Sequence, residues 1–104
     1  MNSEEKQLQL LGLALRASQL ITGEEMTIRS IQKNEAKLVL VASDASDNTK
    51  KKMMNKCQFY KIPIFFEHTS EEISQAIGKS RSICAFTDKG FAESYNKLKG
   101  TRKI

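Results

Sequence analysis

The sequence predicts a single α/β domain in which helices cover both faces of one sheet, a three-layer α/β/α sandwich. Two observations favour this fold class. Short β-rich runs alternate along the chain with segments of about ten residues that carry apolar side chains at helical spacing. With 104 residues, 39% of them hydrophobic, the chain is long enough to bury one core and too short for a second domain.

The first third of the chain contains two expected helices. Residues 4–17 place leucines at helical spacing, which predicts an amphipathic opening helix. A glycine-containing turn then breaks the pattern. Thr22, followed three residues later by Glu25, fits a capping box, and this predicts a short second helix that ends near Asn34.

The middle of the chain contains the expected central strand. Residues 36–42 form a nearly continuous apolar run, which is typical of a strand covered on both faces. Turn and cap residues at 43–48 lead into a helix over 49–60, with apolar positions on one face and lysines on the other. Pro63 stops this helix, and 64–66 resume as a short strand.

The last third repeats the alternation. Thr69 or Ser70 is expected to cap a fourth helix, which Gly78 terminates as a C-cap residue. A strand over 83–86 and a closing helix over 88–98 follow. The chain is therefore expected to hold five helices around the strands of one sheet.

The domain is expected to span residues 1–98, followed by a flexible basic tail at 99–104. No apolar run reaches the roughly 20 residues that cross a bilayer, and the N-terminus is acidic and polar, unlike a secretory signal. We therefore expect a cytoplasmic protein without a membrane partner. Cys57 and Cys84 both fall in apolar patterns, so they are expected to be free, buried thiols.

The charge balance favours a polyanionic partner. The chain carries 17 Lys and Arg residues against 12 Asp and Glu residues, a net charge of +5. Residues 48–66 contain five lysines and no acid. The alternative interpretation is a set of scattered, solvated lysines.

The residues that enzymes and metal sites require are missing from the sequence pattern. The single histidine, His68, stands in a polar stretch and is expected at the surface, without the base and orienting group that a nucleophile needs. Cys57, His68 and Cys84 lack the spacing of metal ligands, and the glycines form no phosphate-binding loop. We therefore predict no metal, no cofactor and no enzymatic activity.

Two stretches combine a backbone turn with cations. Residues 22–29 offer free N–H groups at a helix start, with Arg29 one turn further along to reach phosphate or a guanine edge. Residues 77–81 form a helix-to-strand loop that carries Lys79 and Arg81. Loops at the ends of strands and helices are where such α/β layers place their ligands.

Over roughly residues 8–98 the chain resembles the kink-turn-binding ribosomal proteins, the superfamily of the archaeal "seven-A-e" and eukaryal "thirty-e" large-subunit proteins. The stretches that carry the resemblance are Gly23-x5-Arg29, Ala36-Lys37-Leu38-Val39, Ala42-Ser43-Asp44-Ala45, Ile62-Pro63 and Ala76-Ile77-Gly78. Further stretches resemble the bacterial YlxQ branch of this superfamily. They include Leu11-Gly12-Leu13-Ala14, Thr22-Gly23-Glu24-Glu25, Asn48-Thr49-x-Lys51-Lys52 and Asp88-x-Gly90-Phe91-Ala92.

The resemblance implies a mixed, four-stranded sheet and recognition of a kink-turn, a sharply bent RNA helix with tandem sheared G·A pairs. The family reads this RNA with the start of the second helix, in a G-x-N-E-x-x-K pattern. Gly23 and Arg29 match the glycine and the lysine of that pattern. Glu25 stands where Asn is usual and Met26 where Glu is usual, so base contacts are expected to differ from those of relatives.

The resemblance and the two basic stretches together imply an RNA-binding site. Its candidate residues are Gly23, Glu24, Glu25, Met26, Arg29, Lys37, Ser43, Asp44, Ser46, Lys79, Ser80 and Arg81. For Glu25, a capping box with Thr22 remains an alternative to base contact. The implied partner is structured RNA, either a kink-turn or ribosomal RNA, bound by a monomer on or near the ribosome. The alternative function is a translation-related adaptor whose basic helix meets an acidic protein.

Overall fold

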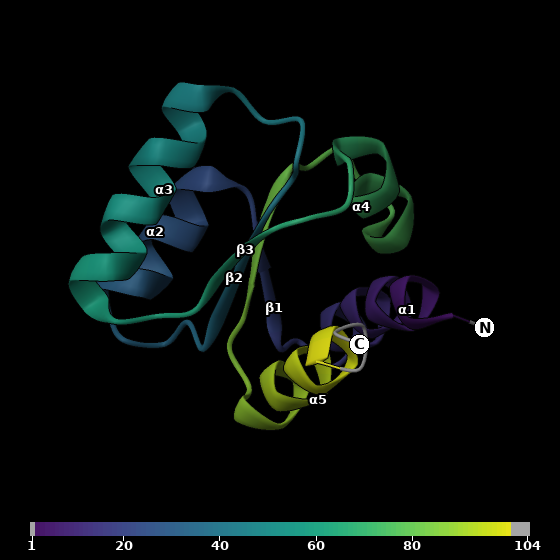
Figure 1. Cartoon of the computed structure of the whole chain (residues 1–104). Coiled ribbons are helices and arrows are strands. Elements are labelled where there is room, and N and C mark those ends of the chain that lie inside the picture. The colour runs from purple at the N-terminus through teal and green to yellow at the C-terminus, as the bar shows by residue number, and fades with distance from the viewer. Residues whose placement is uncertain (1, 101–104) are drawn as a thin grey trace.

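Four short strands form one open, mixed sheet at the centre of the molecule. The structure is a computed structural model that describes residues 2–100 (Figure 1). The strands are β1 (Leu20–Thr22), β2 (Leu38–Val41), β3 (Ile64–Phe66) and β4 (Ile83–Phe86). Their order across the sheet is β1-β4-β2-β3, with β3 parallel to β2 and β4 antiparallel to both of its neighbours. The expected mixed, four-stranded sheet is confirmed.

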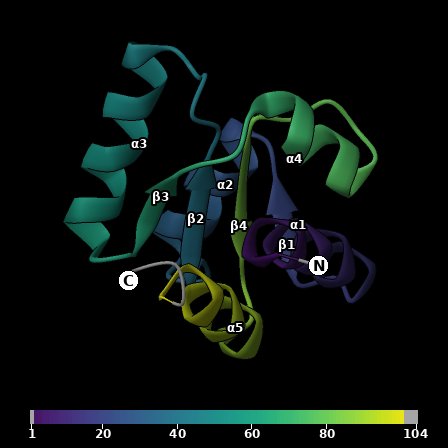
Figure 2. The same ribbon diagram turned by 45° about the vertical axis from the view of Figure 1, so that its right-hand side comes forward.

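Helices cover both faces of this sheet, as Figures 1 and 2 show from two directions. One face carries α1 (Ser3–Arg16), α4 (Ser70–Ile77) and α5 (Lys89–Gly100), and the other carries α2 (Glu24–Gln32) and α3 (Asp47–Tyr60). The predicted α/β/α sandwich is therefore confirmed. The closing helix runs through Gly100, beyond its expected end, and residues 101–104 of the predicted tail lie outside the described residues.

Strand β2 explains why two cores form. Its side chains alternate, so Leu38 and Leu40 join the core beneath α1, α4 and α5, while Val39 and Val41 join the core beneath α2 and α3. All four of these residues are buried. Burial of each such side chain stabilises the fold by about 1.5–3 kcal/mol, which accounts for the apolar run in the sequence.

The helix ends follow their local sequences in three cases. Asn2 and Glu5 form a capping box at the start of α1, and Thr69 and Glu72 form another at the start of α4. Gly78 ends α4 in the left-handed conformation that glycine adopts without strain. Of the two predicted caps of α4, Thr69 rather than Ser70 holds the position.

The capping box predicted for α2 is wrong. Thr22 lies in β1, where its register places it opposite Cys84 of β4, so it is not available as a cap. The N-cap is Gly23, and among residues 2–100 no side chain caps the first turn of the helix. The strand itself was not predicted, because its residues run directly into Gly23 and fit the glycine-containing turn that ends the first helix.

The surface position predicted for His68 is also wrong. The side chain is only 8% exposed, and its Nε2 lies 3.1 Å from the amide Oε1 of the fully buried Gln7. These two residues are 61 positions apart in the chain. His68 stands among polar residues in the sequence, yet it forms a buried polar contact with Gln7 that joins α1 to the segment before α4.

Both cysteines are free and buried, as predicted. Burial raises the pKa of the Cys57 thiol to about 11 and that of Cys84 to about 12. Within residues 2–100, no helix has the length and apolar character needed to span a membrane. The same residues bring together no group of three or more His, Cys, Asp or Glu side chains that could hold a metal ion.

Candidate nucleic-acid interface

Four chain segments meet at one edge of the sheet. Because β1, β2 and β3 all run antiparallel to β4, the segments that follow these three strands and the loop that precedes β4 emerge on the same side. Together they line an open hollow of about 390 Å³. Its walls include Gly23, Glu24, Ala45, Thr49, Ser70, Ser80 and Arg81. The two basic stretches singled out in the sequence therefore come together in space.

The start of α2 forms one wall of the hollow. Gly23 has φ 93° and ψ 153°, a backbone conformation that is essentially restricted to glycine. Its N–H donates to the carbonyl of Ile83 on β4 (2.8 Å), which fixes the turn to the sheet. Because no described side chain caps α2, the N–H groups of its first turn remain for water or a ligand. Such a helix start favours an anion.

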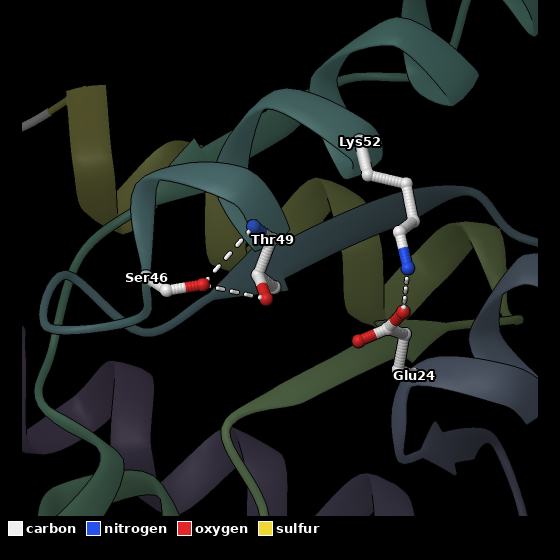
Figure 3. A network of polar contacts seen from close by, with 4 residues as sticks. All are labelled: Glu24, Ser46, Thr49 and Lys52. Carbon is white, nitrogen blue, oxygen red and sulfur yellow. Dashed lines mark hydrogen bonds and ion pairs between the residues drawn. The ribbon is translucent and has the colours of Figure 1, made fainter.

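An ion pair joins the first turn of α2 to the second turn of α3 (Figure 3). The Lys52 ammonium lies 2.6 Å from the Glu24 carboxylate, and both side chains are partly exposed to solvent. Ser46 caps α3 by accepting a hydrogen bond from the Thr49 N–H (3.2 Å). An exposed pair of this kind contributes at most about 1 kcal/mol, so it adds little to the stability of the fold.

The outer side of α2 carries a second, weaker ion pair. Glu25 and Arg29 stand one turn apart, and the Arg29 Nη2 lies 3.6 Å from the Glu25 Oε2. The side chains are 82% and 61% exposed, and Met26 beside them is half exposed. Glu25 therefore takes no part in capping, and all three side chains are accessible to a large partner.

The turn after β2 is fixed to the start of α4. The Asp44 carboxylate accepts hydrogen bonds from the Ser70 N–H (3.0 Å) and hydroxyl (2.7 Å), and these bonds lower the pKa of Asp44. The backbone N–H and the hydroxyl of Ser43 both donate to the carbonyl of His68, at 2.8 and 3.2 Å. This wall of the hollow is thus held by hydrogen bonds to a segment 25 or more positions away.

The loop before β4 closes the hollow from the other side. The Ser74 hydroxyl accepts a hydrogen bond from the Arg81 N–H and donates one to the Arg81 carbonyl, each at 3.0 Å. The Arg81 guanidinium donates to the carbonyl of Ser80 (2.8 Å). A Cβ placed on Gly23 would lie 3.5 Å from the Arg81 Nε, so the guanidinium stem lies directly against the start of α2. Lys79, at the tip of the loop, is exposed.

The candidate residues from the sequence fall into three groups in the structure. Around the hollow or in the segments that frame it lie Gly23, Glu24, Ser43, Asp44, Ser46, Lys79, Ser80 and Arg81. The outer side of α2 carries Glu25, Met26 and Arg29. Lys37 lies apart, before the opposite end of β2, where its Nζ is 3.5 Å from the carbonyl of Asn34.

Sequence reasoning did not single out Thr49, Ser70 or Lys52 as members of the site. Lys52 stood in a run of three lysines, and the run gave no means of separating the one that meets Glu24. Ser70 was recognised only as a possible helix cap. Lys52 and Ser70 could have been identified from their positions within the predicted helices. Each lies in the first two turns of a helix that starts at this edge of the sheet.

Residues 5–96 match the model of the ribosomal protein L7Ae/L30e/S12e/Gadd45 family. The chain is 47% identical over 96 residues to the RNA-binding protein YlxQ of Enterococcus faecium, covering 92% of this chain and 93% of that protein. It is 46% identical over 90 residues to the RNA-binding protein YlxQ of Bacillus subtilis strain 168, with 86% and 87% covered.

Solved structures share the fold. A protein of unknown function from Bacillus halodurans C superposes with a TM-score of 0.86 at 41% identity, covering 89% of this chain and 95% of that one. The 15.5 kD RNA-binding protein of Giardia lamblia superposes with a TM-score of 0.79 at 14% identity, with 95% and 86% covered. The second likeness concerns the fold alone.

Proposed function

Because the chain belongs to the ribosomal protein L7Ae/L30e/S12e/Gadd45 family, we propose that it binds structured RNA of the kink-turn type at the edge formed by α2 and its neighbouring loops. The observation that carries this proposal is the uncapped start of α2, with Arg81 against it, beside an open hollow. Proteins related over most of their length are named RNA-binding proteins. The chain is a binding protein and not an enzyme.

Phosphate binding follows from the arrangement of donors. The first-turn N–H groups of α2 and the positive end of its dipole favour a phosphate beside Gly23. The Arg81 guanidinium lies against the same glycine and supplies a planar pair of donors. Bound at this position, a phosphate is held from two segments that are separate in the sequence.

Arg29 and Glu25 supply the selective part of the site. An RNA phosphate or guanine edge at the outer side of α2 competes with Glu25 for the Arg29 guanidinium, which their long 3.6 Å pairing leaves available. The released Glu25 carboxylate then accepts hydrogen bonds from guanine N–H groups of the bent RNA. Shape recognition would thus come from a rigid helix start placed against the kink, and base selection from these two side chains.

The setting of this activity is proposed on the same basis. We place the protein in the cytoplasm, where as a monomer it binds ribosomal RNA or another structured RNA and takes part in translation or ribosome assembly. The net charge of +5 supports a polyanionic partner of this kind.

The test compares two exposed cations. Arg29→Ala is expected to weaken binding to a kink-turn RNA by about 1–3 kcal/mol and to reduce the preference over a plain duplex. Lys51→Ala, on the exposed side of α3, is the matched control and should have little effect. Affinities for both RNAs are measured by gel shift or calorimetry at one fixed salt concentration.

Two results would contradict the proposal. One is equal affinity of the unaltered protein for the kink-turn and for the duplex. The other is an Arg29→Ala variant that retains the full preference, because the selective contact would then lie elsewhere. Binding of an acidic protein in place of RNA would support the adaptor function instead.

A further inference from the structure

One large apolar side chain on α3 is mostly exposed to solvent. Phe59 is 78% exposed, more than any other large apolar side chain in the described part of the chain. The ring makes a T-shaped contact with Tyr60, with centroids 5.0 Å apart and planes at 75°. Tyr60 is partly buried against the core beneath α2 and α3. The exposed ring therefore rests on a fixed neighbour and presents most of its surface to solvent.

Phe59 belongs to a basic row that leads toward the hollow. Lys52, Lys56 and Phe59 are spaced at i, i+4 and i+7, so they follow one side of the helix. The Lys52 ammonium reaches Glu24 of α2, which identifies this side as the one next to α2 (Figure 3). Seven residues of helix span about 10 Å. The exposed ring thus lies about 10 Å along the helix from the ion pair at the edge of the hollow.

The charges around the ring select the kind of partner. From residue 48 to residue 66 the chain contains five lysines and no acid, so the surroundings of Phe59 attract a polyanion. An acidic amphipathic peptide would need a row of apolar side chains to dock on. The other exposed apolar residue of α3, Met54, lies five positions earlier and about 140° around the helix from Phe59. A single flat ring among lysines suits a base and its phosphates better.

We propose that Phe59 is a stacking platform for a base of single-stranded RNA that continues from the RNA bound at the hollow. Lys56 and the neighbouring lysines hold the phosphates of this strand, and the ring accepts the face of one base. This inference rests on the proposed function, since the hollow anchors the RNA from which the strand extends. It adds a second, sequence-tolerant contact to the site at α2.

The experiment measures what a single-stranded extension adds to binding. The probe is a kink-turn RNA with blunt ends, compared with the same RNA carrying about six uridines at its 5′ or its 3′ end. For the unaltered protein, one of the two extensions should raise affinity roughly tenfold. Phe59→Ala should abolish that gain and leave the affinity for the blunt RNA unchanged.

Three further variants separate stacking from other effects. Phe59→Tyr keeps a flat ring and should retain the gain, whereas Phe59→Leu keeps apolar character and should lose it. Met54→Ala removes the exposed apolar side chain on another side of α3 and should retain it. Far-ultraviolet circular dichroism checks that each variant is folded. We expect the fold to be retained because Phe59 and Met54 are both exposed.

The outcomes are distinct for the two proposals. Failure of the unaltered protein to bind the blunt kink-turn RNA contradicts the proposed function. Normal binding of the blunt RNA with no gain from either extension overturns the stacking platform alone. The stacking platform is also overturned if Phe59→Ala retains the gain in affinity from the extension. The same holds if Phe59→Leu retains this gain as fully as Phe59→Tyr does. In either case the ring would be assigned to a protein contact.

Discussion

The two thiols lie in separate cores, Cys84 with the core beneath α1, α4 and α5 and Cys57 with the core beneath α2 and α3. Burial is the sole cause that raises the pKa of each, to about 12 and about 11. In the unfolded chain both thiols ionise near pH 8.5–9. Between about pH 9 and 12 the unfolded chain therefore binds fewer protons than the folded one, and the free energy of unfolding falls as the pH rises.

This pH dependence gives a prediction at the level of one residue. In Cys84→Ala the thiol is absent, so the free energy of unfolding should fall less steeply as the pH rises. Between pH 9 and 11 the two slopes should differ by about 1.4 kcal/mol per pH unit. Below pH 8 the variant and the unaltered protein should show parallel curves, whatever their absolute difference. Urea unfolding at a series of pH values measures both slopes. Parallel curves at alkaline pH would show that the thiol ionises without unfolding.

Single residues also show when burial can be predicted from the neighbouring residues in the sequence. The two cysteines stood in apolar patterns, so their burial followed from the residues beside them. His68 stood among polar residues, and its burial depends on Gln7 of α1, far away in the chain. Polar side chains are buried when a partner satisfies them, and a partner that distant is supplied only by the tertiary fold.

Among the elements, α2 matters most for the proposed function because its start forms a wall of the hollow. Gly23 places that start in position through a conformation that other residues adopt only with strain. The space beside it is sufficient for a methyl group, since the nearest atom to an added Cβ is the Arg81 Nε at 3.5 Å. The cost of a substitution here is therefore backbone strain and not a clash.

Gly23→Ala is accordingly expected to lower stability by about 1–3 kcal/mol and to weaken RNA binding as the first turn of α2 shifts. Asn2→Ala provides the control, because it removes the cap of α1 on the other face of the sheet and costs about 1 kcal/mol. Chemical unfolding and RNA titration are measured for both variants. A folded Gly23→Ala variant with full RNA affinity would mean that the conformation of this turn is not needed for binding.

Elements marked by their local sequence were predicted well, and β1 was the one strand that was missed. The caps of α4 and the strands β3 and β4 agree with their predicted positions because each depends on residues within a few positions. Strand β1 has three residues and exists through its pairing with β4, more than 60 positions later. Its omission also produced the wrong cap for α2, since Thr22 was assigned to the helix that follows.

At the scale of the molecule, the sequence led to the hypothesis that two basic stretches bind RNA, but it did not predict that they meet. The sheet order β1-β4-β2-β3 brings the start of α2 beside the loop before β4. No local pattern encodes that order, because it depends on the last strand inserting between two earlier ones. The separate position of Lys37, before the opposite end of β2, follows from the same topology.

The whole molecule's charge predicts how RNA binding depends on salt. If about four to six phosphates are contacted, log affinity should fall with log salt concentration with a slope of about −3 to −5. Titrations at several salt concentrations measure this slope for one RNA. Binding that does not respond to salt would mean that the lysines and arginines of this +5 chain do not contact phosphates.

The central position of β4 has a consequence for the way this protein is made. Before residues 83–86 leave the ribosome, β1 has no hydrogen-bonding neighbour and β2 has only the short β3 beside it. The helices made earlier then have no complete sheet on which to bury their apolar faces. Non-local pairing of this kind delays folding until β4 is available for pairing. During translation the growing chain is therefore expected to remain open, and to fold in one step once β4 has left the ribosome.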